Sequence, residues 1–148
     1  MRRVRWGLAV LAGGLLVIQL VPYGRDHDNP PVVAEPSWDS PQTRVLAVSA
    51  CFDCHSNETV WPWYSNVAPI SWLVQRDVDE GREEVNYSEW NRPQEGEESA
   101  ETVREGEMPP RTYLLTHPEA RLTDAQLTAL ADGLATTFGD EGEGEEDD

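Results

Sequence analysis

The chain has 148 residues, which is enough for one folded domain with extensions but not for two domains. It carries 28 acidic residues against 11 arginines and no lysine, so its formal net charge is −17. Nucleic acid and anionic membrane surfaces would be repelled by the folded part and are excluded as its partners. The acidic excess is typical of a surface solvated in a salt-rich medium, although it would also attract a basic partner.

The N-terminal segment combines a basic end with an apolar run. Three arginines lie within the first five residues, and the run Trp6–Tyr23 has Gln19 as its one polar interruption. Its 18 residues are near the lower limit for a helix that crosses a bilayer. Bulky residues end the run where a cleavage site would need small ones. We therefore expect residues 1–23 to be an uncleaved, single-pass anchor in the cell inner membrane rather than a signal peptide.

The positive-inside rule then places everything beyond this anchor in the periplasm or outside the cell. Residues 24–40 contain Pro30, Pro31 and Pro36, and proline favours an extended chain, so we expect a linker that holds the domain off the membrane. Residues 139–148 read GDEGEGEEDD and have no apolar side chain to bury, which predicts a disordered acidic tail. The folded domain should therefore comprise residues 41–138.

Apolar periodicity within this domain is helical, with no convincing alternating strand, and predicts an all-α fold. Helices are expected over Pro41–Phe52 and Glu97–Glu105. Another helix should start at Pro69, with an apolar face formed by Ile70, Leu73, Val74 and Val78. The clearest helix is Thr123–Phe138, which opens with a capping-box pattern at Thr123 and Gln126. Its expected buried stripe consists of Leu127, Leu130, Leu134 and Phe138.

The chain's two cysteines, Cys51 and Cys54, are followed directly by His55. Structural zinc would need a fourth ligand from a second pair, which is missing. A thioredoxin-like dithiol would need neighbouring strands, which the pattern does not predict. The C-x-x-C-H spacing is that of a c-type haem attachment site, because two thiols a short turn apart reach the two vinyl groups of haem. We therefore interpret Cys51 and Cys54 as thioether tethers and His55 as the proximal iron ligand.

Met108 is the best candidate for the distal iron ligand. It is the domain's single methionine and lies in the polar segment GEMPPRTY, where two prolines stiffen the chain after it. His117 is the reserve ligand, and His27 should be solvated within the linker. A haem with His and Met on its two sides has no open position, so we expect one-electron transfer rather than enzymatic catalysis. A bound haem would also supply the core that a small helical domain lacks.

Aromatic residues cluster just after the cysteine pair. Trp61, Trp63, Tyr64 and Trp72 could form walls of a haem pocket, and ordinary core packing is the alternative for each ring. Three arginines could pair with haem propionates or remain solvated on the surface, namely Arg76, Arg82 and Arg111.

Three segments carry a resemblance to a known family: CFDCHSNETVWPWYSNVAPISW, GREEVNYSEW and GEMPPRTYLLTHPEARLTDAQ. They resemble the bacterial haem-binding domain family of small exported proteins, over roughly Arg44–Phe138 and with a similar N-terminal anchor. The resemblance implies a cytochrome c-like all-α fold wrapped around one covalent haem c. It does not identify a redox partner. The chain departs from the family mainly in its acidic excess and acidic tail.

Four functions remain open. The first is a membrane-anchored monohaem c-type cytochrome that carries electrons between a donor and an acceptor redox protein. The second is a fixed haem c subunit of a larger respiratory or photosynthetic complex. The third is a haem-based sensor or peroxidase in which Met108 is labile. The fourth is a haem-free C-x-x-C redox protein. We favour the first.

Overall fold

The computed structural model describes residues 2–139, so the predicted tail lies outside the described residues except for Gly139. These residues form α-helices and 3-10 turns without a β-strand, and Ala34 and Glu89 make one isolated bridge. The predicted all-α class is confirmed. The α-helices are α1 (Arg2–Ile18), α2 (Pro41–Ala50), α3 (Phe52–His55), α4 (Ile70–Glu84), α5 (Ser99–Arg104) and α6 (Asp124–Phe138). The 3-10 turns are η1 (Trp63–Asn66), η2 (Gly96–Glu98), η3 (Tyr113–Leu115) and η4 (Pro118–Ala120).

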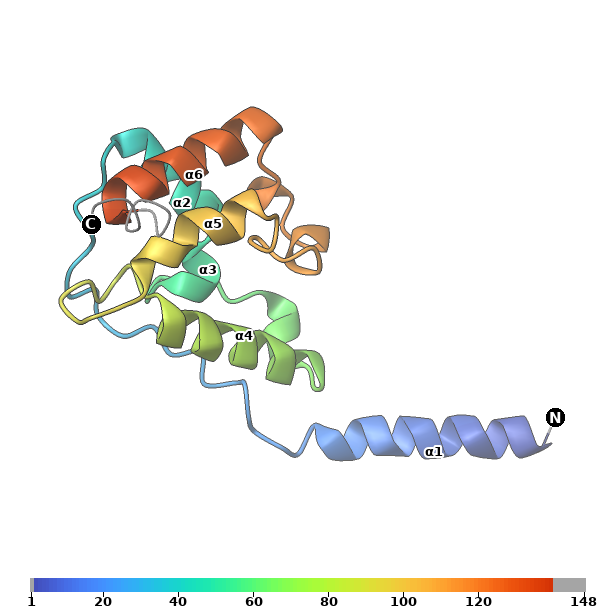
Figure 1. Cartoon of the computed structure of the whole chain (residues 1–148). Coiled ribbons are helices and arrows are strands. Elements are labelled where there is room, and N and C mark those ends of the chain that lie inside the picture. The colour runs from blue at the N-terminus through green and yellow to red at the C-terminus, as the bar shows by residue number, and fades with distance from the viewer. Residues whose placement is uncertain (1, 140–148) are drawn as a thin grey trace, which may run out of the picture.

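Helix α6 lies at the centre of the packing, with α5 and α2 against it, while α4 packs on α3 (Figure 1). As predicted, α6 opens with a capping box between Thr123 and Gln126 and buries Leu130 and Leu134 completely. The core also contains a cluster of aromatic rings that pack edge-to-face or offset, from Trp38, Phe52, Tyr87, Trp90 and Phe138.

The predicted apolar face of α4 is only partly buried. Val78 is in the core, but Ile70 is 45% and Leu73 is 55% exposed. The helix instead turns Gly81 toward α3, where an added Cβ would lie 2.7 Å from the carbonyl oxygen of Cys54. Because only glycine allows this approach, packing against α3 and not maximal apolar burial decides how α4 is rotated.

Helix α1 lies in the N-terminal segment that was expected to be the anchor. None of its side chains is buried, all but Ile18 are exposed, and it extends away from the other helices (Figure 1). It begins at Arg2 and ends at Ile18, within the residues 1–23 expected to form the anchor. Just after its end, the Gln19 side chain accepts from the Ala68 N–H and donates to the Ala68 carbonyl, at 3.0 and 2.8 Å. Among residues 2–139, no helix has the combined length and apolarity that crossing a membrane would require.

Residues 24–40, which we name the strap, also differ from the prediction. They were expected to be a linker, but they lie against the domain. The N–H groups of Val33 and Ala34 donate to the Ser88 carbonyl, at 2.8 and 3.1 Å. Trp38 packs on the aromatic core. Prolines do keep the strap extended, but its remaining backbone groups and Trp38 find partners on the domain, so it is part of the fold.

Candidate functional site

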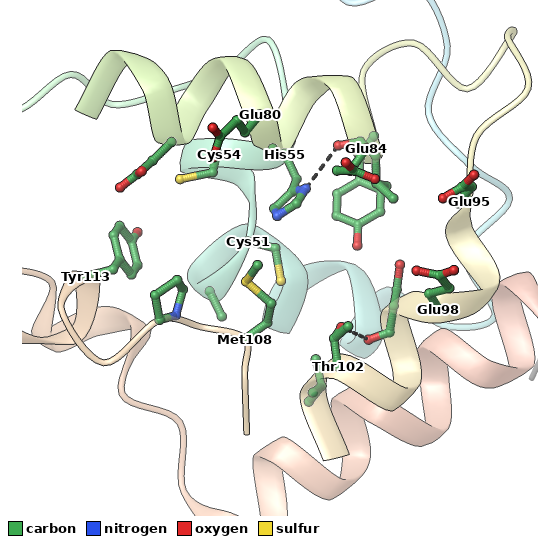
Figure 2. A pocket seen from close by; sticks show the side chains of 18 of the residues that line it. Cys51, Cys54, His55, Glu80, Glu84, Glu95, Glu98, Thr102, Met108 and Tyr113 are labelled. Carbon is green, nitrogen blue, oxygen red and sulfur yellow. Dashed lines mark hydrogen bonds between the residues drawn. The ribbon is translucent and has the colours of Figure 1, made fainter. Parts of the chain in front are cut away.

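A cavity of about 620 Å³ lies between α3, α4, α5 and the loop after α5 (Figure 2). Its lining includes Cys51, Cys54, His55 and Met108, so the structure brings together the four side chains predicted to hold the cofactor. Its volume falls within the range of roughly 300–1,000 Å³ that is usual for small-molecule and cofactor sites. The remaining lining combines apolar groups with acidic side chains.

The two cysteines lie at the start of the short helix α3 and within it. Cys51 lies at the junction where α2 ends and α3 begins, and Cys54 lies within α3. Both are free thiols. Burial raises the pKa of each thiol to about 12, so both are protonated at neutral pH. Figure 2 shows both side chains on the wall of the cavity.

His55 is oriented by the end of α4. Its Nδ1 lies 3.1 Å from the Val85 carbonyl oxygen, which can only accept, so Nδ1 carries the proton. Burial lowers the pKa of His55, which keeps the imidazole neutral. Nε2 then holds a free lone pair on a ring that Figure 2 shows turned into the cavity. A neutral imidazole with its other nitrogen held by a carbonyl is the form in which histidine ligates metals.

Met108 reaches the cavity because of the way α5 ends. Gly106 adopts a left-handed φ of 73°, and its N–H donates to Val103 O at 3.2 Å. The next N–H, from Glu107, donates to Thr102 O at 3.0 Å. These two bonds form a Schellman motif, which reverses the chain after a helix. Met108, whose own N–H also lies 3.2 Å from Thr102 O, is thereby turned back over the cavity, with 37% of the residue exposed.

Acidic groups dominate the polar part of the lining, namely Asp77, Glu80, Glu84, Glu95 and Glu98. Arg76 also lines the cavity, but its Nε is 3.1 Å from Glu80. Burial raises the pKa of Asp77. The other two arginines, for which propionate pairing and a solvated surface position were the alternatives, do not line the cavity. Arg82 donates to the Ser56 and Asp28 carbonyls, and Arg111 is absent from the lining.

The predicted aromatic walls are corrected. None of Trp61, Trp63, Tyr64 and Trp72 lines the cavity, because η1 and the start of α4 pack together outside it. Trp63 is 79% exposed. Trp61 stacks on His27 with ring centroids 4.7 Å apart, so His27 is packed rather than solvated.

Two tyrosines that the sequence interpretation did not assign line the cavity instead. Tyr87 lies in the segment GREEVNYSEW and Tyr113 in the segment GEMPPRTY, and both segments carry the family resemblance. That resemblance was the sequence signal from which the two tyrosines could have been found. His117, the reserve ligand, is outside the cavity and stacks on Tyr113 with ring centroids 3.9 Å apart.

Comparison with known protein families matches residues 13–136 to the haem-binding domain family. The chain belongs to this family. Membership indicates haem as the cofactor, and the residues present fit it: two thiols, a neutral imidazole and a thioether meet at one cavity of suitable size. The match includes the whole strap, in agreement with its packing on the domain. Neither the curated proteins nor the solved structures contain a match to this chain.

Proposed function

We propose that this haem-binding domain is a monohaem c-type cytochrome that transfers single electrons. The observation that carries the proposal is the convergence of Cys51, Cys54, His55 and Met108 on one cavity. The two thiols would become thioether tethers, and the His55 Nε2 and the Met108 sulfur would ligate the iron. Haem c supplies an iron that gains and loses one electron, at a potential that methionine ligation raises relative to two histidines.

The chain's own groups prepare this site. The Val85 carbonyl holds the His55 ring in one tautomer, and burial keeps it neutral, so the ligand is available without a proton to lose. The Schellman turn at Gly106 brings Met108 to the cavity. With both axial positions filled, the protein would serve as a carrier and not as an enzyme, between a donor and an acceptor redox protein.

We further propose that the domain works on the exported side of the inner membrane, attached through its N-terminal segment. Two features support this: the three arginines at the start of the chain, and the exposed apolar side chains of α1. Replacement of residues 1–23 by a cleavable signal peptide, which keeps export but removes the anchor, should move the domain from the membrane fraction into the soluble periplasmic fraction. A truncated domain that stays in the membrane fraction would contradict attachment through this segment and would favour the alternative of a fixed complex subunit.

A labile Met108 defines one further candidate. Loss of the thioether would open a position to another ligand, as in a haem-based sensor or peroxidase. Addition of carbon monoxide to the reduced protein distinguishes the electron carrier from the sensor or peroxidase. A carrier keeps its absorption spectrum, whereas a sensor with a labile methionine binds the gas within seconds.

The decisive experiment is the absorption spectrum of the protein produced in a host that attaches haem c. We expect a covalent c-type spectrum and, in the oxidised state, the weak sulfur-to-iron charge-transfer band. Met108→Ala should abolish that band and lower the midpoint potential, while Cys51→Ser with Cys54→Ser should leave no haem that survives acid–acetone extraction. A chain that carries no covalent haem would overturn the proposal, and survival of the band in Met108→Ala would overturn the distal ligand alone.

A further inference from the structure

Asp53, between the two cysteines, joins the attachment turn to the loop that carries Met108. Its Oδ2 accepts a hydrogen bond from the Tyr113 hydroxyl at 2.8 Å, and its Oδ1 accepts from the Val60 N–H at 3.0 Å. The two partners differ in sequence distance: Val60 is local, but Tyr113 lies 60 positions away. The Tyr113 bond is therefore a tertiary contact between the halves of the candidate haem site.

Tyr113 is well placed to keep this bond. Its ring lines the cavity (Figure 2), and His117 stacks on it with an interplanar angle of 14°. The His117 Nδ1 also lies 3.0 Å from the Tyr113 carbonyl oxygen. Burial and the neighbouring Asp53 carboxylate raise the pKa of the Tyr113 hydroxyl, which keeps it a donor. A phenol that donates to a carboxylate makes a charge-assisted bond, which is stronger than a neutral one.

The Met108 loop, residues 106–113, is thus held at both ends. At its start, Glu107 and Met108 donate their N–H groups to the Thr102 carbonyl of α5. At its end, Tyr113 donates to Asp53 on α3. Pro109 and Pro110 lie between these points and limit backbone rotation, so a movement at Tyr113 is transmitted to Met108.

We propose that Tyr113 is a positioning residue whose hydrogen bond to Asp53 clasps the Met108 loop over the cavity. With the bond in place, the Met108 loop would stay over the cavity, where the thioether could meet the iron of a bound haem; without it, the loop would be free to move and to carry Met108 away. This inference rests on the proposed function for one point, the contact of Met108 with the haem. The Tyr113–Asp53 hydrogen bond itself is a contact within the chain and does not depend on a bound haem.

The test compares Tyr113→Phe, which removes one hydroxyl, with the matched control Tyr23→Phe, whose ring is exposed and outside the cavity. Hydrogen–deuterium exchange of residues 106–113 in the haem-loaded protein should rise roughly five- to tenfold in Tyr113→Phe, as expected for loss of one side-chain hydrogen bond. The charge-transfer band should weaken and the midpoint potential should fall. Tyr23→Phe should match the wild type in all three measurements.

The variant Asp53→Ala tests whether Asp53 is the hydrogen-bond acceptor on which the clasp depends. In Asp53→Ala, where the acceptor is missing, the added change Tyr113→Phe should have no further effect on exchange, because the pair is coupled. Full additivity of the two changes would overturn the clasp, as would unchanged exchange in Tyr113→Phe alone. Exchange that rises equally across the whole domain would also overturn it, because Tyr113 would then have only a general structural role.

The two proposals fail in distinguishable ways. If the wild-type protein lacks the charge-transfer band, the assignment of Met108 as ligand fails, while the exchange comparison still decides whether the clasp holds the loop. If the wild type shows the band and Tyr113→Phe keeps both band and exchange rate, the clasp fails and the ligand assignment stands.

Discussion

Individual contacts place the reactive groups at the cavity. The Val85 carbonyl selects the tautomer of His55, and Gly81 lets α4 approach the turn that carries both cysteines. An added Cβ at Gly81 would meet backbone atoms of Cys54, which cannot rotate away as the end of a flexible side chain could. The position of this turn, and with it the direction of the two thiols, therefore depends on the absence of a Cβ atom at Gly81.

Replacement of Gly81 by alanine should destabilise the protein even though alanine favours helix by about 1 kcal/mol. We expect a net loss of roughly 1–3 kcal/mol in the free energy of unfolding, as for other overpacked interiors, and a lower yield of covalent haem. Urea unfolding and haem content measure both effects. Gly13→Ala is the control, since an added Cβ there meets nothing within 4 Å. Equal stability of the Gly81 variant and the wild type would contradict the tight packing of α4 on α3.

Among the elements, the strap and the end of α5 depend most on single interactions. The strap is joined to α2 by Arg44, whose Nε and Nη2 donate to the two carboxylate oxygens of Glu35 at 2.6 and 2.7 Å. The hydrogen bond from Arg44 lowers the pKa of Glu35. A carboxyl with a lowered pKa stabilises the folded state above its ordinary pKa, and that contribution disappears as the pH falls through the folded value.

Glu35→Gln should therefore reduce stability near neutral pH and have little effect in strong acid. Both side chains are partly exposed, so solvent screening limits the expected loss to about 1 kcal/mol or less. Urea unfolding at a series of pH values, starting near neutrality and ending well below the ordinary value of 4.5, measures the difference. A difference that stays constant across the series would show that the charge of Glu35 is not the cause.

The end of α5 yields a prediction about conformation alone. Gly106 has a φ of 73°, and an added Cβ there would meet nothing within 4 Å. Gly106→Ala should therefore cost about 1–2 kcal/mol through backbone strain and not through a clash. Gly106→Asn should lose less, because asparagine tolerates the left-handed region. Thermal unfolding ranks the wild type and the two variants by stability, and the charge-transfer band reports whether Met108 still ligates the iron. An alanine variant as stable as the asparagine variant would contradict the Schellman turn.

For the molecule as a whole, charge is the feature most relevant to its proposed partners. The net charge is −17, and the cavity itself has a mostly acidic rim. A cationic redox partner would be attracted to this surface, whereas an anionic one would be repelled.

Reduced protein should thus react faster with a cationic oxidant such as a cobalt(III) ammine complex than expected from driving force alone, and slower with anionic ferricyanide. After correction for driving force, the rates with the two oxidants should differ roughly 10- to 100-fold at low salt. They should converge near 1 M salt, where the screening length falls to about 3 Å. Stopped-flow measurements test this. Truncation after Phe138 separates the tail from the rest of the domain: a difference that persists in the truncated protein belongs to the charges before residue 139. Equal, salt-independent rates would exclude electrostatic steering.

Local patterns in the sequence were sufficient for much of the fold. The capping box at Thr123 and the apolar stripe of α6 are correct because each involves residues within a few helical turns. The strap was misjudged because proline content reports an extended backbone but not what the backbone contacts. The contact between Gln19 and Ala68, which lies 49 positions away, was not predictable from the apolar run that contains Gln19.

The sequence by itself determined which reactive groups share one turn, since Cys51, Cys54 and His55 lie within one short helical stretch, and it indicated Met108 as the single thioether available to the domain. Only the tertiary structure decided what surrounds them: acidic groups instead of tryptophans, and Tyr113 bonded to Asp53 across the cavity. Such contacts depend on how α4 and the loop after α5 pack on α3. Periodicity along a chain states which residue types alternate, but not which distant side chains meet.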